Sequence, residues 1–375
     1  MVRWVLLLIL TAFCIIRYLL VINYQIPVNS GDTIRIYGII WNDKIRRENR
    51  TFVVLDKMGV SDGDKVTVIG RVTGQVIDKF GRNIYLEEAQ IEKNYTPVFY
   101  RLRVYLQNRI MSWMPGDLGG LASGILLGGN QLLSYDTRQN FTRDGLSHII
   151  AASGFNVVMV SGWLAVLGRK LKRKRLMIFF GLLGTILYML LAGLSASIIR
   201  AGIMSILSFT ALIYGRKSDA IWSLVISAVM MILVNPWYIL DIGFQLSVMA
   251  TLGVLLSTGN ELKTIFTVQL FTIPLILHHF GQLSIVAPLA NILVIWTVPY
   301  IMQLTALGLI IPPVLYLAWP LLSYMLFVAN WLSRWSWASL TVGQMNWGWV
   351  AIWYLVLAIV YNRYYAKRQI TKAYR

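Results

Sequence analysis

Long apolar runs separated by short polar or basic connections dominate the chain beyond residue 145. Stretches of about 20 apolar residues match the thickness of a bilayer core, so each run predicts a membrane-crossing helix. A further run, with few charges, lies within residues 1–24, and the total predicts about ten spans. The later runs are His148–Gly168, Leu176–Leu194, Ala196–Tyr214, Ala220–Val234, Trp237–Leu256, Ile265–Leu277, Leu283–Ile311, Val314–Leu332 and Trp347–Tyr361. The fold class predicted is a polytopic α-helical membrane protein, with residues 145–362 as its main helical domain.

The N-terminal run predicts an uncleaved transmembrane helix over residues 1–24. Arg3 precedes the run, and no small-residue cleavage site follows it, so a removable signal peptide is disfavoured. A positively charged N-terminal flank favours the cytoplasmic side. The segment that follows is therefore expected outside the cytoplasm.

Residues 31–94 change from apolar runs to short β-rich runs between turn signals. About five strands in so short a segment are typical of a small Greek-key barrel, so we expect an all-β OB-like extracytoplasmic domain. With 11 basic and 10 acidic residues the domain is almost neutral, which leaves DNA binding by it open. The predicted strands are Thr33–Trp41, Thr51–Leu55, Lys65–Val72, Gln75–Ile77 and Asn83–Ile91.

Residues 97–134 predict two short helices that do not span the bilayer. Arg101, Arg103 and Arg109 stand among apolar residues of the first, and burying each arginine in a span costs roughly 2.5–3.5 kcal/mol. An amphipathic helix at the membrane interface therefore fits better. The run Leu118–Leu133 is Gly-rich and short, which predicts a half-crossing or re-entrant helix.

Composition agrees with a membrane protein and adds a strong positive charge. Of 375 residues, 57% are hydrophobic and 13% charged, with mean hydropathy +0.63 and a net charge of +18. Residues 95–375 carry 21 basic and 6 acidic residues. The basic residues fall on alternate connections between the predicted spans. Two explanations remain: the positive-inside rule, which places such connections in the cytoplasm, or binding of a polyanionic substrate. Both termini are then cytoplasmic, and residues 363–375 form a basic tail.

Polar residues inside the predicted spans are the candidate functional residues, because lipid disfavours them. The segment Gly145–Gly162, interpreted as one helix, places His148, Ala152 and Asn156 on one face; helix packing by Gly and Ser is the alternative explanation. Asp241 and Gln245 form a further i, i+4 pair, and Pro288 and Pro299 predict a broken helix. We expect the following residues to line a polar path through the helical domain: Ser147, His148, Ser153, Gly154, Asn156, Arg200, Asp241, Gln245 and Asn291. If the substrate is a polyanion, its cytoplasmic contacts are expected from Arg169, Lys170, Lys172, Arg173, Arg216 and Lys217.

No motif of a soluble enzyme accompanies these residues. The chain has no phosphate-binding GxxxxGK[ST] loop and no HExxH, and it has three His and one Cys, Cys14. These numbers exclude an internal disulfide and a His-rich two-metal hydrolase site. We expect no cofactor, no metal and no enzymatic activity.

The ordered combination of segments resembles the ComEC competence family of inner-membrane DNA-uptake channels. The matching blocks are GILLGGN from Gly124, the GLSHIIAASGFNVV run, Arg200, residues 215–256, and HHFGQLSIVAPLANILVIWTVP from His278. The resemblance implies an OB-like domain outside and an aqueous path for single-stranded DNA. It also implies a helicase-type ATPase motor in the cytoplasm, an extracytoplasmic DNA receptor and contact with membrane lipids.

Two departures from the family pattern remove titratable groups. Phe155-Asn156 replaces the family's usual Leu-His, and Gly129-Asn130 stands where an acidic residue follows LLLG. Many relatives carry a C-terminal metallo-β-lactamase-like domain, and this chain ends after the last predicted helix and its tail. The nuclease is therefore expected to be a separate protein.

Two other functions remain open from the sequence. An intramembrane serine hydrolase would use Ser153 and His148, although five residues apart on one helix they are poorly placed to hydrogen-bond. A transporter of small anions or lipids would use the same polar helices. Polar side chains converging on one hydrated passage would favour the DNA channel over both.

Overall fold

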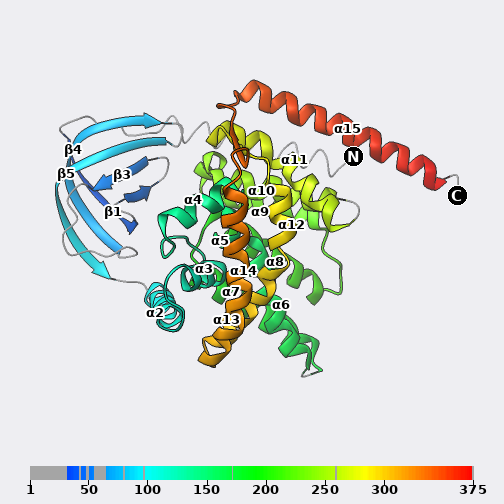
Figure 1. Ribbon diagram of the computed structural model, residues 1–375, viewed down its shortest axis with the longest axis horizontal. Coiled ribbons are helices and arrows are strands. Elements are labelled where there is room, and N and C mark those ends of the chain that lie inside the picture. The colour runs from blue at the N-terminus through cyan, green and yellow to red at the C-terminus, as the bar shows by residue number, and fades with distance from the viewer. Residues whose placement is uncertain are drawn as a thin grey trace.

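The computed structural model describes residues 32–41, 44–47, 50–54, 65–78, 81–95, 98–170, 172–257 and 260–373. A small β-barrel lies to one side of a helical bundle, as Figure 1 shows. The helix predicted at residues 1–24 lies outside the described residues.

Five strands close the barrel in the order β1-β2-β3-β5-β4. Antiparallel pairing joins neighbouring strands except at β3 and β5, which pair in parallel. Alternate apolar residues fill the interior, as the two-residue period of a strand requires; they include Ile36, Val66, Val68 and Leu86. The strands are β1 (Thr33–Trp41), β2 (Lys44–Arg47), β3 (Arg50–Val54), β4 (Lys65–Asp78) and β5 (Gly81–Tyr95).

Two strand predictions differ from the structure. The runs Lys65–Val72 and Gln75–Ile77 belong to one strand, β4, with a register shift between Val72 and Gly74. A bulge carries one strand through such a shift without ending it. Strand β2 was not predicted, because three of its four residues, KIRR, are basic.

The rest of the described chain is mainly helical. Helices α2 to α7 are Val98–Trp113, Asp117–Leu127, Tyr135–Arg143, Ser147–Ile150, Gly154–Lys170 and Lys174–Ala192. Helices α8 to α11 are Ala196–Ile213, Ala220–Val234, Ile242–Leu256 and Glu261–Phe280. Helices α12 to α15 are Ala287–Val294, Thr297–Gly308, Leu315–Ser333 and Trp347–Ala373. Two 3-10 turns, η1 (Pro236–Leu240) and η2 (Pro312–Val314), and a two-stranded sheet of β6 (Gln282–Ser284) and β7 (Ser339–Thr341) complete the fold.

Three described helices are long and apolar enough to cross a membrane, and a bent pair makes a fourth if it counts as one span. The three are Lys174–Ala192, Ala196–Ile213 and Pro312–Ser333, and the pair is α12 with α13. Four other apolar helices are shorter, at Asp117–Leu127, Ala220–Val234, Ile242–Leu256 and Trp347–Tyr361. The described residues thus support fewer spans than the ten predicted from apolar runs, because several runs are broken by turns or end in shorter helices.

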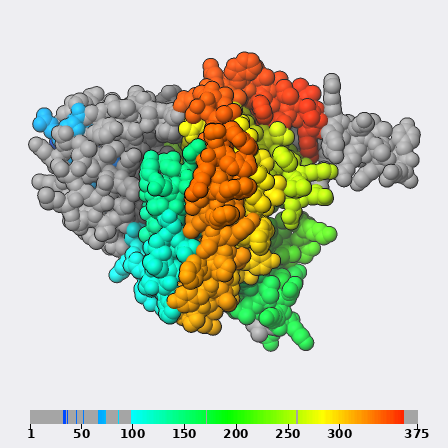
Figure 2. Space-filling view, viewed as in Figure 1, coloured from blue at the N-terminus to red at the C-terminus, as the bar shows by residue number. Residues whose placement is uncertain are grey.

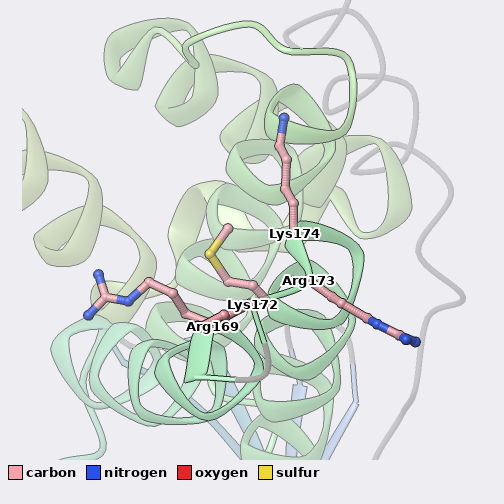
Figure 3. Close-up of a pocket in the computed structure, with 5 residues that line it drawn as sticks. Arg169, Lys172, Arg173 and Lys174 are labelled. Carbon is pink, nitrogen blue, oxygen red and sulfur yellow. The ribbon is translucent and has the colours of Figure 1, made fainter.

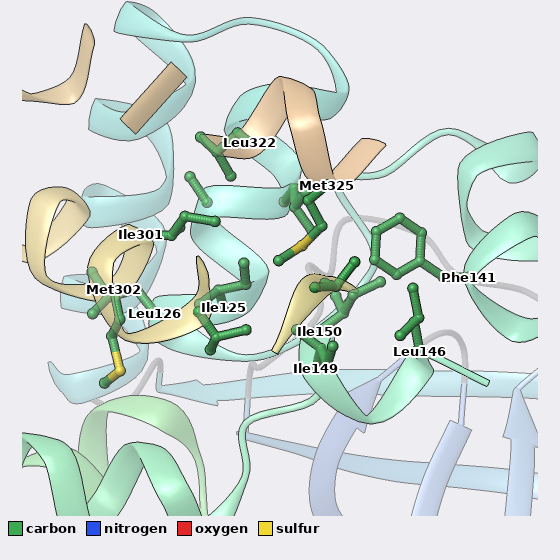
Figure 4. Close-up of a cluster of buried hydrophobic side chains, with 14 of the residues drawn as sticks. Ile125, Leu126, Phe141, Leu146, Ile149, Ile150, Ile301, Met302, Leu322 and Met325 are labelled. Carbon is green, nitrogen blue, oxygen red and sulfur yellow. The ribbon is translucent and has the colours of Figure 1, made fainter. Parts of the chain in front are cut away.

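In the largest apolar cluster, the 11-residue helix α3 packs against the 19-residue helix α14. Figure 4 shows side chains from α3, α13 and α14 meeting those of the α4–α5 region. Between helices in a membrane such side chains contribute through van der Waals packing, because lipid is as apolar as they are. The labelled members are Ile125, Leu126, Phe141, Leu146, Ile149, Ile150, Ile301, Met302, Leu322 and Met325.

Helix α3 and the chain after it form a hairpin that enters and leaves on the same side. A Cβ added at Gly120 would lie 2.6 Å from the carbonyl oxygen of Leu132, so the returning chain runs directly along α3. Asp117, at the start of α3, accepts hydrogen bonds from the Ser134 backbone N–H at 2.7 Å and the Ser134 hydroxyl at 2.8 Å. These contacts close the hairpin, and the half-crossing or re-entrant character of Leu118–Leu133 stays a prediction.

The polar segment Gly145–Gly162 is not one helix, which corrects the sequence interpretation. Helix α5 ends at Ile150 and α6 begins at Gly154. A Cβ added at Gly128 would lie 2.4 Å from Ala152 Cβ, so the break packs tightly against the end of α3. His148 and Asn156 therefore lie on different helices. The predicted break within Leu283–Ile311 is confirmed, with an angle of 47° between α12 and α13.

Candidate functional site

Three side chains from three helices bind the backbone carbonyls at the C-terminal end of α3. The Asn156 amide on α6 donates to Ile125 O at 2.7 Å, and the Tyr188 hydroxyl on α7 donates to Leu126 O at 2.9 Å. Arg103 on α2 donates to Gly128 O. The last carbonyls of a helix have no partner within it, so these donors allow α3 to end inside the bundle.

Arg103 also links the C-terminal end of α3 to the C-terminal end of α7. Its Nη1 donates to Ala192 O at 2.9 Å, so one guanidinium contacts the negative ends of two helix dipoles. Gly129 and Gly193 have φ values of +101° and +91°, and a Cβ at either would lie 3.2 Å from that guanidinium. The sequence placed Arg103 with its neighbours at the membrane interface, but the side chain is buried within the protein.

Arg200 on α8 is a buried cation beside this cluster. Its side chain is 5% exposed, its Nε donates to Ser247 Oγ at 2.9 Å, and its Nη1 lies 3.2 Å from Met204 Sδ. Within the described part of the chain no carboxylate pairs with it. A guanidinium has five N–H donors, so Arg200 retains capacity to bind an anion.

Gly154 brings Arg200 and Asn156 together. A Cβ at Gly154 would lie 3.3 Å from Arg200 Nη2 and 3.0 Å from Ala201 Cβ. Ser153 donates to Asn156 Oδ1 at 3.2 Å. Four predicted residues, Ser153, Gly154, Asn156 and Arg200, therefore lie in one cluster at the junction of α3, α6 and α8.

Two further candidates lie at the start of α10: Gln245 is on the helix, and Asp241 is immediately before it. Gln245 Nε2 donates to Ile239 O at 2.7 Å, and Gln245 Oε1 lies 2.7 Å from His279 Nε2. Asp241 is the N-cap of α10 and accepts from the Phe244 backbone N–H at 2.8 Å. The pair does not form the i, i+4 helical face that was predicted, because Asp241 precedes the helix.

The remaining candidates lie elsewhere. Ser147 and His148 are exposed on α5, where His148 Nδ1 lies 3.0 Å from Gly145 O. Asn291 donates to Ala287 O, one turn earlier in its own helix. Among the described residues Ser153 and His148 share no hydrogen bond, which gives a hydrolase pair no support. The nine path candidates therefore form one cluster of four, a pair at the start of α10 and three residues elsewhere.

The predicted phosphate-contacting residues are exposed at two connections. Arg169, Lys172, Arg173 and Lys174 surround an open pocket of about 270 Å³ with Met177. Figure 3 shows Arg169 and Arg173 extending to opposite sides and Lys174 in a third direction, so they do not converge on a single ligand. Lys170 is exposed on the same connection, and Arg216 and Lys217 are exposed after α8.

Three residues of these clusters were missed from the sequence. Tyr188 and Ser247 resemble many ordinary residues of apolar helices, and only the fold brings them to Leu126 O and Arg200. His279 carried a signal as part of the His pair, but its partner Gln245 is 34 positions away. No group of three or more potential metal-binding side chains occurs within the described ranges.

Comparison with known proteins identifies the helical region. A family model described as "Competence protein" matches residues 125–366. The chain is also 25% identical over 242 residues to ComE operon protein 3 of Bacillus subtilis (strain 168), covering 58% of this chain and 31% of that relative. It thus spans under a third of that protein's length. No solved structure matches the chain. Since the family model covers more than half of the residues, the chain belongs to the competence protein family.

Proposed function

We propose that this protein takes part in DNA uptake and forms the membrane path by which one unpaired strand reaches the cytoplasm. One observation carries the proposal: Arg200 is buried, has no carboxylate partner among the described residues, and belongs to a competence-family bundle. An ionisable residue inside a membrane bundle is a functional-site hypothesis by default, and a cation with no carboxylate partner suits an anionic substrate. A DNA strand supplies one phosphate charge per nucleotide.

The route lies along α8. This helix is shared by the large apolar cluster, which includes Ile198 and Ala201, and by a smaller cluster formed with α9 and α10. Arg200 donates from α8 to Ser247 on α10. Separation of α10 from α8, with loss of this hydrogen bond and of the apolar contact in the smaller cluster, would expose the guanidinium to a strand.

Favourable but weak contacts suit passage, because a site that binds too tightly holds its substrate. Arg200 provides the one strong contact in this cluster, and hydroxyl and amide groups provide the others. The exposed cations at the α6–α7 and α8–α9 connections then receive the emerging phosphates. Such contacts make binding salt-dependent, with a slope of roughly −0.7 per phosphate neutralised on single strands.

The proposed location is the bacterial cytoplasmic membrane, with both termini inside. The basic connections support this orientation under the positive-inside rule. The barrel is then extracytoplasmic, and its closed five-stranded order with one parallel pair supports assignment as an OB fold. A cytoplasmic ATPase motor and an outer DNA receptor are the proposed partners, and the helical region is proposed to act as the channel.

The test measures uptake of labelled DNA in cells that depend on this chain. Arg200→Ala and Asn156→Leu are expected to abolish uptake while the protein remains in the membrane. Arg101→Ala, which removes an exposed arginine of α2, is the matched control and is expected to retain uptake. Normal uptake in both site variants would refute the path.

A second measurement separates this function from transport of small anions or lipids. Purified protein is expected to bind single-stranded DNA, with mononucleotides and dispersed anionic lipid competing poorly. Competition by mononucleotides at similar concentrations of phosphate would favour a small-anion transporter instead.

A further inference from the structure

Three tryptophans form a contiguous aromatic ladder at the C-terminal end of α14. The rings of Trp331 and Trp335 have centroids 5.2 Å apart, and those of Trp335 and Trp337 are 4.7 Å apart. Trp331 and Trp337 are 46% and 50% exposed. Trp331 meets the half-buried Trp335 edge-on at 74° and Trp337 is tilted by 40° to it, so the two outer tryptophans present exposed surface in different directions.

The ladder rests on a fixed backbone. Ala338 is fully buried, its N–H donates to Trp335 O at 3.0 Å, and its carbonyl accepts from Ile285 N at 2.9 Å. The next residue, Ser339, pairs with Ser284 in the β6–β7 sheet. A surface held in this way loses little conformational entropy when a ligand binds.

The surroundings of the ladder are polar and positively charged. Helix α4, with the sequence YDTRQNFTR, lies beside α14 (Figure 2), and Asn140 on α4 donates to Asn330 Oδ1 at 2.8 Å. Arg334, between the tryptophans in sequence, is exposed, as is Arg143 at the end of α4. No acidic residue follows Glu261 anywhere in the sequence. Helix α4 carries Asp136 together with Arg138 and Arg143, so the charged groups of α4 and Arg334 are three basic and one acidic, which is complementary to phosphate.

The ladder lies at the end of the bundle away from the basic connection. Figure 1 shows the end of α14 near the top of the view and the α6–α7 connection at the bottom. The apolar span that contains α14 ends at Ser333, so Trp335 and Trp337 lie beyond it. Aromatic faces beside cations are the combination that holds unpaired nucleic acid, since every base has a π face that can stack.

We propose that Trp331, Trp335 and Trp337, together with Arg334, form a platform on which the bases of an unpaired DNA strand stack before the strand enters the membrane path. This proposal rests on the proposed function and adds a subsite at the opposite end of the route from the basic connections. The competing role for the same residues is a tryptophan belt at the lipid headgroups, which would not distinguish a strand with bases from one without them.

The test compares two probes on the purified full chain: a labelled oligothymidylate and an abasic strand of the same length and charge. Stacking on exposed rings is expected to make the oligothymidylate bind about tenfold more tightly. In the double variant Trp331→Leu/Trp337→Leu this preference is expected to disappear, with affinity for the abasic strand unchanged. Phe at both positions is expected to retain most of it.

Trp349→Leu is the matched control, because Trp349 is 65% exposed on α15 and makes no ring contact with the ladder among the described residues. It is expected to keep the preference for bases. A preference that survives in the Leu double variant would overturn the platform. Equal binding of both probes by the wild type would also overturn it while leaving the proposed function standing, and binding of neither probe would refute both.

Discussion

The side-chain amide of Asn156 donates a 2.7 Å hydrogen bond to the carbonyl oxygen of Ile125, 31 residues earlier in the chain. In a longer helix that carbonyl would accept from the N–H of Gly129. Here α3 ends at Leu127, and Gly129 N donates instead to Ile150 O at 3.2 Å. Asn156 therefore replaces a missing helical bond and joins the start of α6 to the end of α3.

Asn156→Leu is expected to destabilise the protein by about 1–3 kcal/mol, because it leaves the buried Ile125 carbonyl without a donor. The measurement is unfolding of the purified protein by denaturing detergent. Asn291→Leu is the control, since Asn291 is also buried but donates only to Ala287 O within its own helix. An equal loss of stability in the two variants would show that the hydrogen bond from Asn156 on α6 to Ile125 on α3 contributes no more than a bond within one helix.

Arg103→Lys is expected to lower stability by about 1.5–3 kcal/mol, the range for hydrogen bonds to charged groups. A lysine ammonium keeps the charge but lacks the planar fork that reaches Gly128 O and Ala192 O together. The same unfolding measurement applies. Arg101→Lys on the same helix is exposed and is expected to change stability by less than about 0.5 kcal/mol. Wild-type stability in the Arg103→Lys variant would show that joining the two helix ends contributes nothing.

Local sequence signals predicted the parts of this fold that depend on near neighbours. Alternating apolar residues predicted β1 and β5, and the Gly-rich run predicted a short helix where α3 occurs. Two prolines predicted the bend between α12 and α13. Each of these features is decided by residues a few positions apart, so a single sequence carries the information.

Features that depend on distant contacts could not be predicted in the same way. The arginines of α2 look alike in sequence, and only the carbonyls of Gly128 and Ala192 make Arg103 a buried residue. The break between α5 and α6 depends on packing against Gly128. Polar spacing alone also could not show that Gln245 pairs with His279 instead of joining Asn156.

Asp144 predicts a pH dependence of stability. Its carboxylate is fully buried between α4 and α5, and within the described residues neither oxygen has a hydrogen-bond partner. Burial raises the pKa of this carboxyl from 3.8 to about 7, against a smaller opposing effect of Arg143. Between these two values the folded state binds more protons than the unfolded state, so stability is expected to fall as pH rises from about 4 to about 7.

The measurement is the unfolding midpoint across that pH range for wild type and Asp144→Asn. The asparagine does not titrate, so the variant is expected to show a flatter profile. Asp136→Asn, at an exposed position of α4, is expected to leave the wild-type slope in place. An unchanged slope in Asp144→Asn would assign the pH dependence to another group.

Two glycines of α6 are expected to respond to alanine with opposite signs. A Cβ at Gly168 would lie 2.6 Å from the backbone of Leu176 and Met177, so Gly168→Ala forces α6 and α7 apart at their basic connection. Gly162 has no atom within 4 Å of the same position. Gly162→Ala therefore gains helix propensity, about 0.5–1 kcal/mol, whereas overpacking at Gly168 costs about 1–3 kcal/mol. Both substitutions add the same methyl group to the same helix. The difference in stability between the two variants, measured by unfolding in denaturing detergent, therefore reports the close backbone contact at Gly168 and not helix propensity. Stabilisation by both would show that α6 and α7 do not approach as closely in the membrane.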